Sequence, residues 1–125
     1  MTVPEDLLYT NEHEWVRVEG DVAVVGITDY AQGELGDVVF VELPAVGTAV
    51  KQADAFGTIE AVKAVSDLFA PASGEVVEVN PLLTDAPETV NKDPYGEGWM
   101  VKVRLSSAGE LANLLKADAY KQLVG

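Results

Sequence analysis

The sequence predicts a mainly β fold with two antiparallel sheets, and two observations support this prediction. Short valine-rich runs recur along the 125 residues and are bounded by Gly, Pro, Asn and Asp, which is typical of a sandwich or barrel. The stretch from about 36 to 105 also contains an internal repeat, because "GDVVFVELP" at 36–44 resembles "GEVVEVNPL" at 74–82. Each copy leads to a second strand, "FGTIEAV" or "GWMVKVRL". We therefore expect two β units, related by an approximate two-fold axis, that bury their apolar faces against each other.

The first elements in the chain are expected to be a hairpin and a short helix. "EWVRVEG" and "DVAVVGI" flank a Glu-Gly-Asp turn, which predicts a hairpin with Trp15, Val22 and Val24 facing inward. In "TDYAQGELG", Thr28 is a suitable N-cap and Gly36 a suitable stop, so the spacing predicts one short helix in the N-terminal half.

The end of the chain predicts a second helix. In "SSAGELANLLKADAYKQLV", Ser107 stands three residues before Glu110, which is the spacing of a capping box. Four leucines recur near one helical face, at Leu111, Leu114, Leu115 and Leu123. We therefore expect a helix over about 108–123, packed by its apolar stripe on the sheets.

The composition narrows the classes of function. The length of the chain is that of one ordinary domain, so residues 1–125 are expected to form a single domain with one core. Eight Lys and Arg against 21 Asp and Glu give a net charge of −13, which repels phosphate backbones and anionic lipids. Nucleic acid and membrane are therefore not expected as partners. Because we find no targeting signal and no apolar run of ~20 residues, we expect a cytoplasmic protein. We also expect it to be a monomer.

The residues that usually perform catalysis are scarce in this chain. Cysteine is absent and His13 is the only histidine, so no metal-binding cluster is expected and the chain is not expected to be an enzyme. His13 stands between Glu12 and Glu14, whose carboxylates should favour its charged form. A surface position is favoured over a role as proton donor.

Lys63 is the residue whose placement requires an explanation. It lies in "IEAVKAVSD", among small and β-branched residues, and an unpaired ammonium is costly to bury. We therefore place it at the exposed tip of a hairpin over about 59–67, which joins the two repeated units. Three hypotheses compete: a solubilising charge, a Schiff-base lysine, and a lysine that is modified covalently. The nearby carboxylates, Glu60 and Asp67, oppose the lowered pKa that a Schiff-base lysine needs.

Four blocks of sequence resemble a known family. "HEWV", "VGITDYAQGELGDVVFVELP", "GTIEAVKAVSDLFAPASGEVVEVNP" and "DPYGEGWMVKV" occur in the order found in the H proteins of the glycine cleavage system. The resemblance runs from about Tyr9 into the C-terminal region. It implies a barrel-sandwich hybrid fold, with lipoic acid attached through an amide to Lys63.

The resemblance also implies a role and a set of partners. Members of the family accept an aminomethyl group from glycine decarboxylase (P protein) and deliver it to the aminomethyltransferase (T protein). Dihydrolipoyl dehydrogenase (L protein) then reoxidises the dithiol, and a lipoylating enzyme attaches the cofactor. A chain without cysteine suits this role, because the cofactor brings the disulfide.

The family also implies a surface cleft that shelters the loaded arm. The matching positions here include Glu14 and Asp67. Glu12 stands where some relatives have a small hydroxyl residue, and Tyr30 and Glu34 stand where some have histidine, so a histidine-lined cleft is not expected. Ala61 replaces a frequent serine and should leave lipoylation intact.

Three alternatives stay open on the sequence. The chain could be a lipoyl or biotinyl carrier of another complex, although Val62-Lys63-Ala64 fits neither usual motif well. It could relay lipoyl groups to other proteins. It could also be an acidic interaction module whose lysine stays unmodified.

Overall fold

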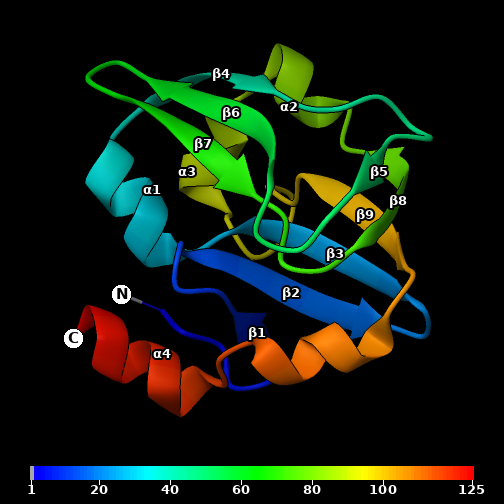
Figure 1. Cartoon of the computed structure of the whole chain (residues 1–125). Helices are drawn as coiled ribbons and strands as arrows, with labels where there is room; N and C mark the ends of the chain where they lie inside the picture. Colours follow the sequence, from blue (N-terminus) through cyan, green and yellow to red (C-terminus); the bar gives the residue numbers. More distant parts are fainter. Residues whose placement is uncertain (1) are drawn as a thin grey trace.

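Two antiparallel sheets build the computed structural model, which describes residues 2–125 (Figure 1). One sheet has six strands in the order β1-β2-β3-β9-β8-β5, and the other has three in the order β4-β6-β7. The strands are β1 (Leu8–Tyr9), β2 (Glu14–Glu19), β3 (Val22–Ile27), β4 (Val38–Glu42), β5 (Ala49–Val50), β6 (Ala55–Ala61), β7 (Val65–Phe69), β8 (Gly74–Val79) and β9 (Val101–Leu105). The helices are α1 (Asp29–Leu35), α2 (Leu82–Asp85), α3 (Thr89–Lys92) and α4 (Ala117–Val124), with a 3₁₀ helix at Ala108–Asn113.

The predicted repeat is visible in the strand pairing. In the first copy β4 pairs with β6, and in the second β8 pairs with β9, both antiparallel. The register shifts between Val38 and Phe40 in β4 and between Val76 and Glu78 in β8. The repeat aligns Val39 with Val77, so the same position is bulged in both copies. Bulges bend strands and increase their twist, and here they curve each unit around the common core. The predicted mainly β fold with two sheets is confirmed.

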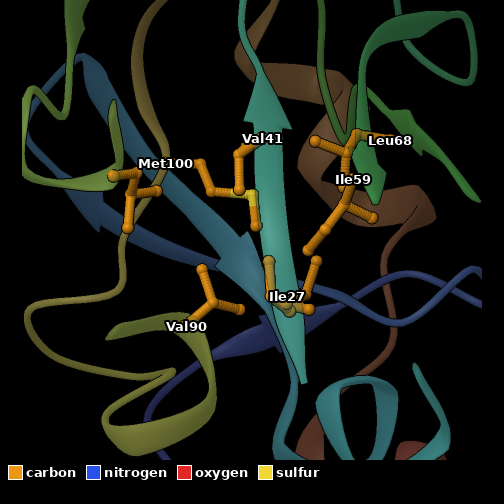
Figure 2. Packing of buried hydrophobic residues seen from close by; sticks show 8 residues of the cluster. Ile27, Val41, Ile59, Leu68, Val90 and Met100 are labelled. Atoms are coloured by element: carbon orange, nitrogen blue, oxygen red, sulfur yellow. The ribbon is translucent and has the colours of Figure 1, made fainter. Parts of the chain in front are cut away.

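The core between the sheets takes its residues from both of them and from the short helices (Figure 2). Ile59 and Leu68 from the small sheet meet Ile27 from the large sheet and Met100, which directly precedes β9. Leu83 of α2 and Val90 of α3 close one end of this cluster. Neither copy of the repeat could bury these side chains alone, which explains why the two units pack together.

The β2–β3 hairpin forms as predicted, and Trp15 and Val24 are buried as predicted, whereas Val22 is only partly buried. Trp15 and Val24 pack with Tyr120 in the cluster beneath α4. Val16 and Val25 instead face the interior between the sheets, where they pack with residues of β8 and β9. Both faces of the hairpin are apolar because the C-terminal segment covers the one that a simple sandwich would leave in water.

The helix α1 begins and ends where the sequence predicts. The Thr28 hydroxyl accepts a hydrogen bond from the backbone N–H of Ala31 at 3.2 Å, which satisfies one free donor of the first turn. Gly36 ends the helix with φ 81° and ψ −156°. This combination of angles is essentially restricted to glycine.

The C-terminal segment differs from the single helix predicted over about 108–123. Ser107 makes no side-chain capping bond, and the Glu110 carboxylate does not turn back to it but accepts from the Ser73 N–H at 2.7 Å and from the Ser73 hydroxyl at 2.8 Å. Leu115 then forms a backbone bridge with Tyr9, which interrupts helical pairing until α4 begins at Ala117.

The predicted leucine stripe was also partly wrong. Leu123 is 51% exposed, whereas Ala117 and Tyr120 are the fully buried residues of α4. The break before Ala117 rotates the last helix relative to the 3₁₀ helix, so the four leucines do not share one face.

Gly36 and Gly33 offer a matched test of the backbone at the end of α1. We expect Gly36→Ala to lower the free energy of unfolding by about 1–3 kcal/mol, because alanine is strained at this φ and ψ. Gly33 lies inside α1 and a Cβ atom there would meet nothing within 4 Å, so Gly33→Ala should raise stability by up to about 1 kcal/mol. Urea unfolding of both variants measures the difference, and equal effects of the same sign would contradict this account.

Candidate functional site

Lys63 occupies the tip of the β6–β7 hairpin. Ala61 and Ala64 exchange backbone hydrogen bonds of 2.7 and 3.4 Å, which leaves Val62 and Lys63 as the two central residues of the turn. Val62 is 74% exposed and Ala61 only 5%, so the change from buried to exposed side chains occurs between these two neighbouring residues. The exposed Lys63 is therefore presented on a turn whose two ends are fixed.

The tip is also tied to the corner between α1 and β4. The Val62 N–H donates to the Asp37 carbonyl at 3.0 Å. Beside it, the Asn91 side chain accepts from the Val38 N–H at 2.9 Å and donates to the Gly36 carbonyl at 2.8 Å. Because this corner carries the tip, the position of Lys63 depends on α3 as well as on its own hairpin.

The side chain of Lys63 folds back against the end of α1. A Cβ atom added to Gly36 would lie 3.1 Å from the Lys63 Cε atom. The absence of a side chain at Gly36 therefore gives the lysine stem its resting place. The ammonium lies near the carboxyl end of a helix, where a positive charge is favoured.

A cleft of about 250 Å³ lies between α1, the start of β2 and the β6–β7 hairpin. We call it the α1 cleft. It brings together the two residues singled out from the sequence, Glu14 and Asp67, and the three positions that depart from the family pattern. Its lining consists of Glu12, His13, Glu14, Ile27, Tyr30, Ala31, Glu34, Leu35, Ile59, Ser66, Asp67 and Leu68.

Glu14 is the buried carboxyl group of this cleft. It lies opposite Ile27 in the β2–β3 pair, so its side chain points toward the small sheet, and it is 2% exposed. One oxygen accepts from the Thr10 hydroxyl at 2.6 Å and the other from the Phe69 N–H at 3.2 Å. Burial raises the pKa of Glu14 to about 7, although both hydrogen bonds act to lower it. Asp67, by contrast, is exposed on β7.

His13 differs from what its neighbours in sequence indicated. Its ring is half-buried and packs 4.9 Å from the Tyr30 ring. Burial lowers the pKa of His13 below its usual 6.5, although Glu12 and Glu34 act to raise it. Glu12 thus acts in the direction that the sequence predicted, but the net shift of the His13 pKa is downward because desolvation is the larger effect.

One contact of His13 has no signal in the sequence. Its Nδ1 atom lies 2.9 Å from the Tyr120 hydroxyl, which belongs to the last helix. Partners that far apart in the chain leave no local pattern, so only the fold could reveal this pair.

A second cavity, of about 460 Å³, adjoins the site on the side of Gln52 and Leu114 and shares Glu12 and Glu14 with the α1 cleft. It contains no residue between Ile59 and Leu68, so we assign the site to the α1 cleft. Within residues 2–125, no group of three or more His, Asp or Glu side chains is placed to hold a metal ion. Over the same range, no helix has the length and apolarity needed to cross a membrane.

Comparisons with a family model, with curated proteins and with solved structures all lead to the same family. The family model described as "Glycine cleavage H-protein" matches residues 7–125. Glycine cleavage system H proteins from Bacteroides fragilis and Rubrobacter xylanophilus are 59% and 65% identical, over 99% and 94% of this chain and 98% and 91% of theirs. The crystal structure of such a protein from Mycobacterium marinum superposes with a TM-score of 0.88 at 45% identity, covering 96% of this chain and 97% of that one.

The buried Glu14 should make stability depend on pH. In the unfolded chain a Glu ionises near pH 4.5, whereas Glu14 in the folded protein retains its proton up to about pH 7. Its contribution is therefore fully present below about pH 4.5 and is lost as pH rises through about 7. Glu14→Gln keeps an oxygen acceptor but cannot ionise, so it should gain about 2 kcal/mol relative to the parent between pH 5.5 and 8.

Urea unfolding at the two pH values measures this change. Glu42→Gln, which removes an exposed carboxylate outside the cleft, is the control and should follow the parent. A difference between Glu14→Gln and the parent that is the same at both pH values would contradict the burial of a titrating Glu14.

Proposed function

This chain belongs to the glycine cleavage H-protein family, and we propose that it carries lipoic acid in amide linkage on Lys63. It is the lipoyl-carrying shuttle of the glycine cleavage system, and a carrier subunit rather than a catalyst. The single observation that supports Lys63 as the attachment site is its exposed place in the turn between Ala61 and Ala64. Its stem lies against Gly36, which follows Leu35 of the cleft lining.

The residues around Lys63 suit a covalent attachment site. A modifying enzyme has to reach the ε-amine, and small neighbours at Ala61 and Ala64 leave it accessible. The hydrogen bonds at the base of the tip hold the backbone in one position, so the lysine is presented in a defined direction. When bound, the lipoyl group would supply a disulfide that opens as it accepts the aminomethyl group and forms again when the resulting dithiol is reoxidised. This cysteine-free chain cannot supply a disulfide itself.

The α1 cleft fits a charged arm that must be kept from water. Its floor is apolar, with Ile27, Ile59 and Leu68 all at most 3% exposed. Glu14 and Asp67 stand at its polar side and can accept hydrogen bonds from an ammonium group. Glu12 and Glu34 line the same cleft and add negative charge where some relatives have neutral groups. We propose that these residues hold the amine of the loaded arm while the floor excludes water.

Partners with positively charged surfaces suit the face next to the tip. Strands β4, β6 and β7 carry Glu42, Glu60 and Asp67 and contain neither Lys nor Arg. Amide formation at Lys63 would remove the positive charge from the turn between β6 and β7. We propose that this face steers a monomeric carrier toward glycine decarboxylase, the aminomethyltransferase, dihydrolipoyl dehydrogenase and the lipoylating enzyme, since opposite charge raises rates of encounter.

Lys63→Arg tests the attachment site. The substitution keeps a cation at an exposed tip, so stability should change by no more than about 0.5 kcal/mol. A guanidinium is not an acylatable amine, so the variant should gain no lipoyl mass when it is produced together with a lipoylating enzyme. It should also accept no aminomethyl group from glycine decarboxylase. Intact-mass spectrometry and glycine-dependent loading measure both outcomes.

Lys51→Arg and Lys92→Arg are the controls, because both lysines are exposed and lie outside the hairpin. They should be lipoylated and loaded like the parent. A lipoyl mass on Lys63→Arg would overturn the assignment, and a parent that never gains this mass in its own cells would favour an unmodified interaction module.

The cleft is tested by the lifetime of the loaded arm. We expect Asp67→Ala and Glu14→Ala to be lipoylated normally but to lose the aminomethyl group to water faster, by several-fold for the exposed Asp67 and about tenfold for the buried Glu14. Quenched-flow mass spectrometry of loaded protein measures the decay. Glu42→Ala is a matched control, since Glu42 shares the outer face of the small sheet with Asp67 through Thr58 but lies outside the cleft. Equal decay in all four proteins would place the protection elsewhere.

A further inference from the structure

The last helix contributes one buried oxygen atom to the neighbourhood of the α1 cleft. Tyr120 of α4 is 0% exposed, and its hydroxyl lies 2.7 Å from the Thr28 hydroxyl and 2.9 Å from His13 Nδ1. Figure 1 shows α4 beneath α1 and beside β1, on the far side of α1 from the hairpin tip. One hydroxyl therefore contacts two segments that are separate from its own helix.

Both of those segments lead into the lining of the α1 cleft. Thr28 caps α1, and α1 supplies Tyr30, Ala31, Glu34 and Leu35 to the lining. His13 also belongs to the lining, together with Glu12 and Glu14. The Thr28 N–H also donates to the His13 carbonyl at 3.0 Å. The start of α1 and the His13 segment are thus joined by one backbone bond and by the Tyr120 hydroxyl.

The ring of Tyr120 is held in place independently of its hydroxyl. It stacks on the Tyr9 ring, with centroids 4.6 Å apart and planes 10° from parallel. The Tyr9 hydroxyl makes its own bond, to the Pro4 carbonyl at 2.6 Å, away from the α1 cleft. Removing the Tyr120 oxygen should therefore leave the stack and α4 in place, while the start of α1 and the His13 segment keep only the backbone bond between Thr28 and His13.

We propose that Tyr120 is a positioning residue for the α1 cleft. Its hydroxyl fixes the spacing between α1 and the His13 segment, so that the C-terminal helix controls how well the cleft excludes water. This inference rests on the proposed function for its consequence, the protection of a loaded arm. The spacing itself is a property of the unmodified chain and can be measured there.

Tyr120→Phe is the test and Tyr9→Phe is its matched control, because each removes one buried hydroxyl from the same aromatic stack. On the unmodified chain, amide hydrogen exchange at Ala31 should be faster in Tyr120→Phe, since this N–H is bound by the Thr28 hydroxyl. The NMR titration midpoint of His13 should move up toward its ordinary value as water enters. On the loaded chain, the aminomethyl group should be lost three- to tenfold faster. Tyr9→Phe should change none of the three.

Two results would overturn the inference. One is parental exchange at Ala31 and a parental His13 midpoint in Tyr120→Phe. The other is an equal change in both variants, which would show a general loss of stability. Failure of the proposed function is distinct, because it appears as a parent chain that cannot be lipoylated or loaded. The exchange and titration measurements decide the positional claim in that case too.

Discussion

The geometry of the site depends on the side chain of Asn91. This amide accepts from the β4 backbone at Val38 and donates to the α1 end at Gly36 and to Gln32. It thereby joins α3, α1 and β4 at one corner, and the same corner binds the hairpin tip through Asp37 and Val62. A protruding tip is normally the most mobile part of a fold. Here three backbone segments converge beneath it, so an exposed lysine is combined with a fixed backbone.

Whereas Lys63 is a charged group exposed to water, Glu14 is a carboxyl group that the fold buries, although its ionised form would be more stable in water. Its two hydrogen bonds reach Thr10, just before β2, and Phe69 in the small sheet, so it links the two sheets beside the α1 cleft. Burial opposes ionisation, and near pH 7 the group is poised between its two states. A carboxyl group in this condition can accept a positive partner by releasing its own proton, which a permanently ionised surface carboxylate does not do.

The sequence was informative wherever the determinant is local. Thr28 and Gly36 stand at the right spacing around α1, and the two copies of the β unit place Lys63 at the join between them. Predictions from the sequence failed where a residue far away in the chain binds a group that the local pattern had assigned to a nearby partner. Glu110 has the spacing of a capping residue but is bound by Ser73, and Leu115 continues a leucine pattern but pairs with Tyr9. The burial of His13 and its contact with Tyr120 are likewise set by packing between segments that have no pattern in common.

The arrangement of the two ends of the chain has a practical consequence. Glu5 and Lys121 form an ion pair and Tyr9 bridges Leu115, so the first and last elements lie together. Figure 1 shows β1 and α4 at the end of the molecule opposite the β6–β7 tip. A fusion partner, a spectroscopic label or a solid support attached at either terminus would therefore lie away from Lys63. A protein tethered in this way would still expose Lys63 to its partner proteins.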